Sequence, residues 1–130
     1  METLKITGDD SSPDVYLDKE RDIFIINGRS LPEDAIAVYA PIIKWFDTYI
    51  ESPNANTLLD IRFEYINSSS IKQIAKLLAL LQKIKDKGFG IKVKWHYAEE
   101  DVDTMQYGER LAKIINYPIV LQAETPTSSK

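Results

Sequence analysis

The fold is decided by residues 57–81, which read TLLDIRFEYINSSSIKQIAKLLALL and change from a strand pattern to a helix pattern within four residues. Apolar and polar residues alternate over Thr57–Ile66, which is typical of a half-buried strand. From Ser70 onward, apolar residues recur every three or four positions, which predicts a helix with one buried face. The Asn67–Ser70 segment between them predicts a turn, in which Ser70 and Gln73 form the capping box of the helix.

The same two patterns recur along the rest of the chain. Ser30 and Glu33 predict a capping box at the start of an earlier helix, and Pro41 predicts a kink or a restart within it. The Asn27–Gly28 pair predicts the end of the strand before that helix. The other predicted strands are Leu4–Ile6, Val15–Leu17, Ile23–Ile26, Ile91–Tyr97 and Ile119–Ala123, and an acidic segment, Glu99–Asp103, predicts the start of a third helix.

The two long strands indicate how many layers the fold has. One face of each is apolar, with Leu59, Ile61, Phe63 and Tyr65 in the first and Ile91, Val93, Trp95 and Tyr97 in the second. The opposite face carries Asp60, Arg62, Glu64, Lys92, Lys94 and His96. A sheet covered on both faces would have apolar strands throughout, so we expect helices on one face only. The sequence predicts a two-layer α/β domain with a mixed sheet and the order β-β-β-α-β-α-β-α-β.

Length and composition limit the classes of function. The chain has 130 residues, which suits one domain, predicted over residues 1–124 with a tail over residues 125–130. It has no cysteine, which excludes disulfides, thiolate metal sites and a cysteine nucleophile and fits the reducing cytoplasm. The net charge of −4 disfavours nucleic acid as a partner, and neither a membrane span nor a signal peptide is predicted.

Few residues are candidates for catalysis or metal binding. His96 is the only histidine, and we expect it to be an exposed strand residue beside two lysines, with no catalytic triad indicated by the spacing. The acidic segment Glu99–Asp103 does not have the spacing of a calcium loop and suits a helix start. Asp60 and Glu64 flank Arg62, which indicates a solvated ladder of charges. The sequence therefore predicts no metal and no cofactor.

The serine turn, Ser68–Ser70, has two interpretations. Helix capping explains Ser70 without any further function. Alternatively, a phosphate on this turn would meet backbone N–H groups and the positive end of the helix dipole. It would add a charge of about −1.5 to −2 at one point of the surface. Physical reasoning alone favours capping.

Several segments in this order resemble a known family. They are Gly28–Asp34, Pro41 with Trp45, Tyr65–Ser70, and Trp95-His96-Tyr97 followed by Glu99–Asp103. The chain resembles the STAS domain of anti-sigma-factor antagonists and, more closely, the SiaC family of bacterial regulatory phosphoproteins, from about Leu4 to Glu124.

This resemblance implies a non-enzymatic cytoplasmic switch with a STAS-like fold. Family members are phosphorylated at this turn by a partner kinase and dephosphorylated by a PP2C-type phosphatase. The unphosphorylated form activates a diguanylate cyclase, which raises cyclic di-GMP and favours biofilm formation. The acceptor falls on Ser68, where the family often has Thr. Ser69 ranks second because it aligns with the Asp-Ser-Ser-Gly turn of STAS domains, and Ser70 ranks third.

Other functions remain open at this point. The resemblance to STAS domains allows an anti-sigma-factor antagonist in a stress pathway. A small α/β enzyme would use Ser68 or His96. A phosphorelay receiver would need an acidic pocket at the strand ends, whereas Asp60 lies early in its strand. A structural dimer module could use the polar face of the sheet.

Overall fold

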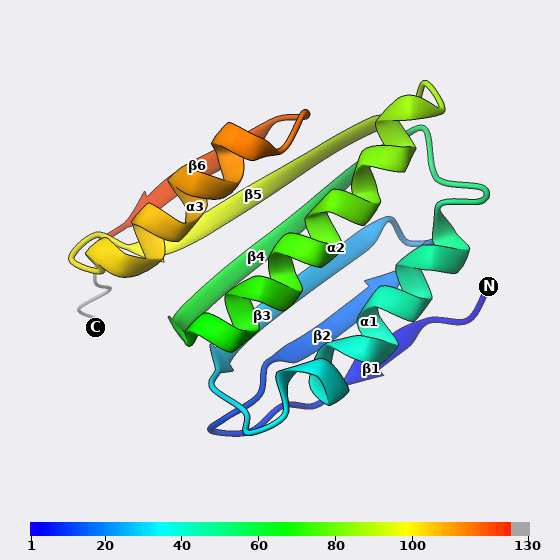
Figure 1. Cartoon of the computed structure of the whole chain (residues 1–130). Helices are drawn as coiled ribbons and strands as arrows, with labels where there is room; N and C mark the ends of the chain where they lie inside the picture. The colour runs from blue at the N-terminus through cyan, green and yellow to red at the C-terminus, as the bar shows by residue number, and fades with distance from the viewer. Residues whose placement is uncertain (126–130) are drawn as a thin grey trace.

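A computed structural model describes residues 1–125 of the chain (Figure 1). The predicted tail, apart from Thr125, lies outside the described residues. The elements are β1 (Leu4–Ile6), β2 (Asp14–Asp18), β3 (Ile23–Ser30), α1 (Ala35–Tyr49), β4 (Asn56–Ile66), α2 (Ser68–Asp86), β5 (Gly90–Ala98), α3 (Val102–Ile114) and β6 (Ile119–Glu124). The predicted order of strands and helices is confirmed.

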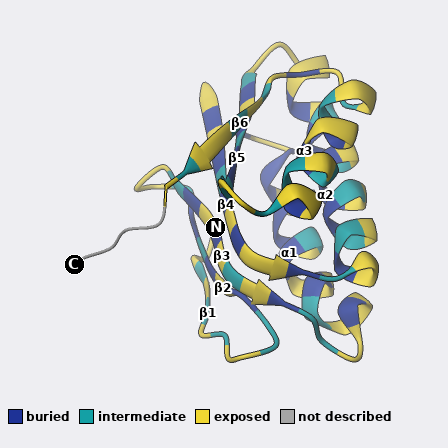
Figure 2. Cartoon of the chain, turned by 90° about the vertical axis from the view of Figure 1, so that its left-hand side faces the viewer, coloured by how far each residue is buried: buried dark blue, intermediate teal, exposed yellow. Residues whose placement is uncertain are grey.

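The six strands form one mixed sheet in the order of the sequence, β1 to β6. The first three strands pair antiparallel, as short connections allow, and β3 to β6 pair parallel because a helix crosses over between each pair. All three helices lie on one face of the sheet (Figure 2). The two-layer α/β architecture with an uncovered sheet face is therefore confirmed.

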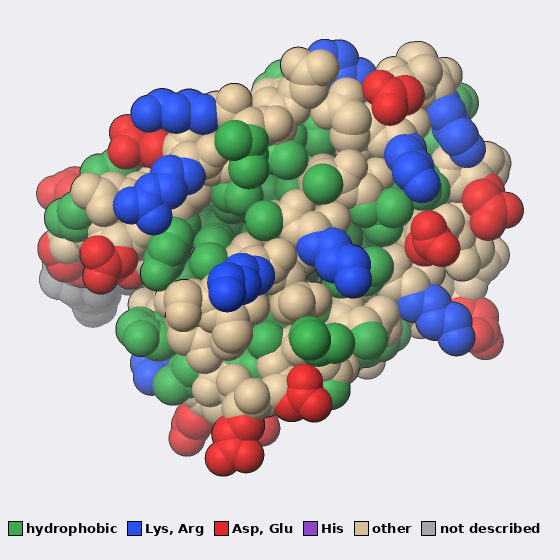
Figure 3. Space-filling view, in the orientation of Figure 1, with side chains coloured by type: hydrophobic (Ala, Val, Ile, Leu, Met, Phe, Trp, Pro, Cys, Tyr) green, Lys and Arg blue, Asp and Glu red, His purple; other side chains and the backbone are tan. Residues whose placement is uncertain are grey.

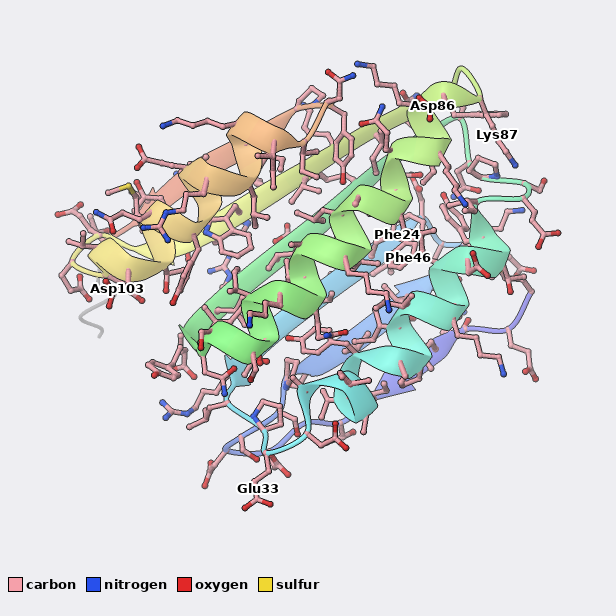
Figure 4. The ribbon with its side chains drawn as sticks, viewed as in Figure 1. Phe24, Glu33, Phe46, Asp86, Lys87 and Asp103 are labelled. Atoms are coloured by element: carbon pink, nitrogen blue, oxygen red, sulfur yellow. The ribbon has the colours of Figure 1, made fainter. Side chains whose placement is uncertain are left out.

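The hydrophobic core fills the space between the sheet and the helices. β4 and α2 lie at its centre, and Leu59, Ile61, Leu77 and Leu81 are fully buried. Phe24 of β3 and Phe46 of α1 pack with their ring centroids 6.2 Å apart, at the side of the core that α1 covers (Figure 4). This rigid layer fixes where each strand ends and where the next helix begins.

The end of β3 differs from the sequence prediction. The strand does not end at Asn27–Gly28 but continues to Ser30. It can do so because Gly28 adopts φ 127°, a backbone angle open to glycine. Ser30 is a buried strand residue and not a helix cap. Asp34 caps α1 instead, accepting a hydrogen bond from the Ala37 amide at 3.0 Å.

Helix α1 runs as one element through Pro41, without the restart that the sequence left open. Pro41 lies on the exposed side of α1, while Tyr39, Ile42 and Phe46 on the other side are fully buried. Burial of this apolar stripe on both sides of the proline stabilises the helix despite the lost backbone hydrogen bond.

A β-bulge near the end of β4 corrects the prediction for Tyr65. Gly28 pairs with Phe63 and Arg29 pairs with Tyr65, so Glu64 is an extra residue without a partner. The alternation shifts by one position there. Tyr65 is 48% exposed and Ile66 takes the buried position that alternation had assigned to Tyr65.

Candidate functional site

Asn67 forms the turn between β4 and α2. Its side-chain Oδ1 accepts a hydrogen bond from the Ser70 amide at 2.8 Å, and its own amide donates to the Ser30 carbonyl at 2.9 Å. Asn67 is therefore the N-cap of α2, and the prediction that Ser70 caps this helix is wrong. The helix begins at Ser68, three residues earlier than a capping box at Ser70 indicates.

The three serines of the first turn have different surroundings. Ser70 is fully buried and its Oγ accepts a hydrogen bond from Ser30 Oγ at 2.8 Å. Ser69 is exposed, and its hydroxyl donates to Asn67 Oδ1 at 3.1 Å. Ser68 is exposed, and its hydroxyl has no hydrogen-bond partner within residues 1–125. Among these serines, Ser68 therefore presents the most accessible hydroxyl.

A buried pair of hydroxyls fixes the turn from below. Ser30 Oγ and the Tyr39 hydroxyl lie 2.7 Å apart, and both side chains are fully buried. Burial raises the pKa of Tyr39 to about 12, despite the opposing effect of the hydrogen bond with Ser30. The first turn of α2 is thus tied to both β3 and α1.

Beside Ser68 lies a hollow of about 270 Å³ between the end of β4 and the starts of α2 and α3. Its lining residues are Tyr65, Ile66, Asn67, Ser68, Asp101, Asp103, Thr104 and Tyr107. Two carboxylates and no basic side chain line it, so its side chains carry negative charge. Figure 4 shows Asp103 at the start of α3, at the same end of the molecule where α2 begins.

The acidic segment contributes to this wall as a helix start, as the sequence predicted. Asp101 is the N-cap of α3, and its carboxylate accepts hydrogen bonds from the Thr104 amide at 3.1 Å and the Thr104 hydroxyl at 2.7 Å. Within residues 1–125, no group of three or more His, Asp or Glu side chains is arranged to hold a metal ion. In the same range, no helix has the length and apolar character needed to cross a membrane.

His96 lies away from this turn, on the uncovered face of the sheet, and the prediction that it is exposed is wrong. Its side chain is only 5% exposed because acidic and basic neighbours on β4 and β6 cover it. Its Nε2 lies 2.8 Å from Asp60 Oδ1 and its Nδ1 lies 3.3 Å from Glu124 Oε2. Arg62 pairs with the same Glu124 at 2.7 Å.

This cluster does not form the catalytic pair that an enzyme would need. The polar partners of His96 within the described residues are Asp60, Arg62 and Glu124, and Ser68 is not among them. The expected ladder around Arg62 is thus replaced by an Arg62–Glu124 ion pair between β4 and β6, and by polar contacts of His96 that bring in β5.

Sequence reasoning missed three contributors to the site. Asn67 was overlooked as a cap, although asparagine before a helix is a known capping signal. Tyr65 reaches the hollow only because of the bulge at Glu64, which the alternating sequence hides. Tyr107 comes from another helix, and only the tertiary fold brings it close.

Comparison with known proteins gives a consistent result. The model of the SiaC family regulatory phosphoprotein matches residues 6–124. A curated but uncharacterized protein of Pseudomonas aeruginosa strain UCBPP-PA14 is 27% identical over 123 residues, covering 95% of this chain and 98% of that protein. The STAS-like label for the fold stays a prediction, since these matches are to SiaC.

Solved structures agree with the family match. SiaC of Pseudomonas aeruginosa superposes with a TM-score of 0.86 at 27% identity, covering 95% of this chain and all of that one. A crystal structure of the diguanylate cyclase SiaD in complex with its activator SiaC, from the same organism, contains a chain with a TM-score of 0.85 and 26% identity, covering 93% and 99% of the two chains. The chain therefore belongs to the SiaC family of regulatory phosphoproteins, and it is a regulatory protein and not an enzyme.

Proposed function

We propose that this protein activates a diguanylate cyclase when Ser68 is unphosphorylated and releases the cyclase when Ser68 carries a phosphate. The observation that carries the proposal is the exposed Ser68 hydroxyl in the first turn of α2, which has no hydrogen-bond partner within residues 1–125. Family membership supports a regulatory phosphoprotein, and the SiaC of the solved complex is the activator of its cyclase.

The proposed cycle needs two further enzymes. A serine/threonine kinase transfers the γ-phosphoryl group of ATP to Ser68 Oγ; the bond to the β-phosphate oxygen breaks, ADP leaves, and the hydroxyl proton passes to a base of the kinase. A PP2C-type phosphatase hydrolyses the phosphoserine and returns the hydroxyl and inorganic phosphate. Since the kinase draws on ATP, this cycle operates in the cytoplasm.

Phosphorylation opposes docking without unfolding the domain. Ser68 is at the surface, so a phosphate needs no rearrangement of the core. Burying a dianion in an interface whose other side offers it no positive charge costs several kcal/mol, which is enough to weaken a complex by orders of magnitude. Asp101 and Asp103 line the same hollow and offer the phosphate no compensating positive charge.

The test uses tagged protein returned to its native cells. We expect a diguanylate cyclase to be captured by the wild type and by Ser68→Ala, and its cyclic di-GMP synthesis to rise when either protein is added. Protein with phosphoserine incorporated at position 68 should do neither. Ser69→Ala should behave as wild type, because the Ser69 hydroxyl is already bonded to Asn67.

Mass spectrometry locates the phosphate independently. The tryptic peptide Phe63–Lys72 contains all three serines of the turn. We expect phosphate on Ser68 that varies with growth conditions. If protein with phosphoserine at position 68 still captured the cyclase, the proposed switch would be contradicted.

A further inference from the structure

A row of lysines runs along the outer side of α2 and begins at the phosphorylation turn. Lys72, Lys76 and Lys83 follow Ser68 at spacings of four, four and seven residues, with the small Ala79 filling the gap. Residues spaced in this way share one face of a helix, and all of these are exposed. Figure 3 shows basic side chains along the middle of this face of the molecule, where α2 runs in Figure 1.

We name these three side chains the lysine ridge (Lys72, Lys76 and Lys83). None of them makes an ion pair or a side-chain hydrogen bond within residues 1–125. In contrast, Lys85 of the same helix donates to the backbone carbonyl of Asn116, and Lys87, its C-cap, donates to that of Ile50. The ridge is a row of three separate positive side chains on a protein whose net charge is −4.

The two sides of Ser68 have opposite charge. Asp101 and Asp103 line the hollow on the α3 side. Lys72 lies four residues after Ser68, about one helical turn further along α2. An acidic group at the first of two such positions interacts favourably with a lysine at the second. A phosphate on Ser68 is therefore repelled by α3 and attracted by Lys72.

From this arrangement we propose that the lysine ridge is the docking surface for an acidic face of the partner enzyme, and that phosphoserine 68 closes it by binding Lys72. The proposal rests on the proposed function and specifies the partner's chemistry. An acidic partner loses Lys72 as a contact and meets a new dianion at the same end of the ridge. Both effects oppose binding, so a single modification at one end weakens the whole surface.

The first experiment compares two pairs of charge reversals in unphosphorylated protein. Lys72→Glu with Lys76→Glu alters the ridge, and Lys44→Glu with Lys113→Glu makes the same charge change on exposed residues of α1 and α3. The probe is the partner captured by the wild type. We expect the ridge pair to weaken binding at least about tenfold and to reduce its dependence on salt, while the control pair binds as wild type.

Equal affinities for the two pairs would overturn the ridge as a docking surface. The outcome also separates the two proposals. If phosphoserine at position 68 releases the cyclase but the ridge pair still binds it, the proposed function is supported and the ridge is rejected as the docking surface. If the captured partner is not a cyclase and the ridge pair no longer binds it, the ridge is supported as a docking surface and the proposed function is rejected.

The second experiment needs no partner. Phosphoserine at position 68 should raise the Tm of the isolated protein, and Lys72→Gln should remove part of that increase because the lysine no longer pairs with the phosphate. Lys113→Gln is the matched control and should leave the increase intact. If phosphorylation raised the Tm by the same amount in the wild type and in Lys72→Gln, the proposed pair between Lys72 and the phosphate would be overturned.

Discussion

At the scale of single residues, three identical side chains at the start of α2 differ only in what surrounds them. Ser70 is fully buried against Ser30, Ser69 bonds to Asn67, and Ser68 faces solvent. Asn67 carries the capping role, so none of the serines is needed for it. This separation leaves Ser68 available for modification while the turn keeps its geometry.

Removing the Asn67 cap should loosen the turn. Asn67→Ala deletes the acceptor for the Ser70 amide and should lower the free energy of unfolding by about 1 kcal/mol, the usual cost of losing an N-cap. Asn67→Asp keeps an acceptor oxygen in place and is the control, with stability close to that of the wild type. Urea unfolding followed by far-UV circular dichroism measures both, and equal stability of the alanine and wild-type proteins would contradict the assigned cap.

At the scale of the elements, local periodicity predicted most of the fold. The alternation in β4 and β5 and the helical spacing in α2 are strong because each element buries one face against the same core. The exceptions are non-local: β3 extends to Ser30 because it pairs with β4, and Tyr65 turns outward because Glu64 has no partner across the ladder. Neither neighbour is visible in the local sequence.

The candidate site was predictable only in part. Ser68 was found through the resemblance to a family, and the acidic start of α3 was found from charge. The hollow that joins them depends on β4 and β5 being parallel neighbours, which brings the starts of α2 and α3 to one end of the molecule. His96 was misplaced because its burial comes from Asp60 and Glu124 on neighbouring strands.

Gly108 allows α3 to lie close to β5, and replacing it should separate the two. A Cβ at this position would lie 2.6 Å from Trp95 Cδ1, closer than any van der Waals contact. Gly108→Ala gains about 1 kcal/mol of helix propensity but overpacks the core at a cost of about 1–3 kcal/mol. We expect net destabilisation and an altered Trp95 environment in near-UV circular dichroism.

An exposed position on the same helix is the control for Gly108. Glu109→Ala changes the next residue of α3, which faces solvent, and should leave the near-UV spectrum unchanged. A Gly108→Ala protein that is more stable than the wild type would show that α3 can move away from Trp95 at little cost.

At the scale of the whole molecule, the two faces of the sheet have different roles. The helices cover one face and carry the serine turn, Ser68–Ser70, and the lysine ridge. The other face is polar, and the Arg62–Glu124 ion pair, with the contacts of His96 to Asp60 and Glu124, connects its last three strands. The proposed switch therefore acts on the helical face, and the uncovered face holds the edge of the sheet together.

The buried tyrosines of the core make stability depend on alkaline pH. Burial raises the pKa of Tyr39 to about 12 and also raises the pKa values of Tyr49 and Tyr117. In the unfolded chain tyrosine ionises near pH 10, so the unfolded state loses its protons first. The stability that these neutral hydroxyls contribute is complete below about pH 10 and is lost as the pH rises toward about 12.

Urea unfolding from about pH 9 to about pH 12 measures this loss. In Tyr39→Phe, Ser30 loses a hydrogen-bond partner, so the free energy of unfolding should be lower than that of the wild type at about pH 9. It should then fall less steeply as the pH rises, because one of the groups that ionise has been removed. Tyr65→Phe is the control, because it makes the same chemical change on a side chain that is half exposed in the native state. A Tyr39→Phe protein with the wild-type slope would mean that Tyr39 ionises equally readily in the folded and unfolded states, against its complete burial beneath the serine turn.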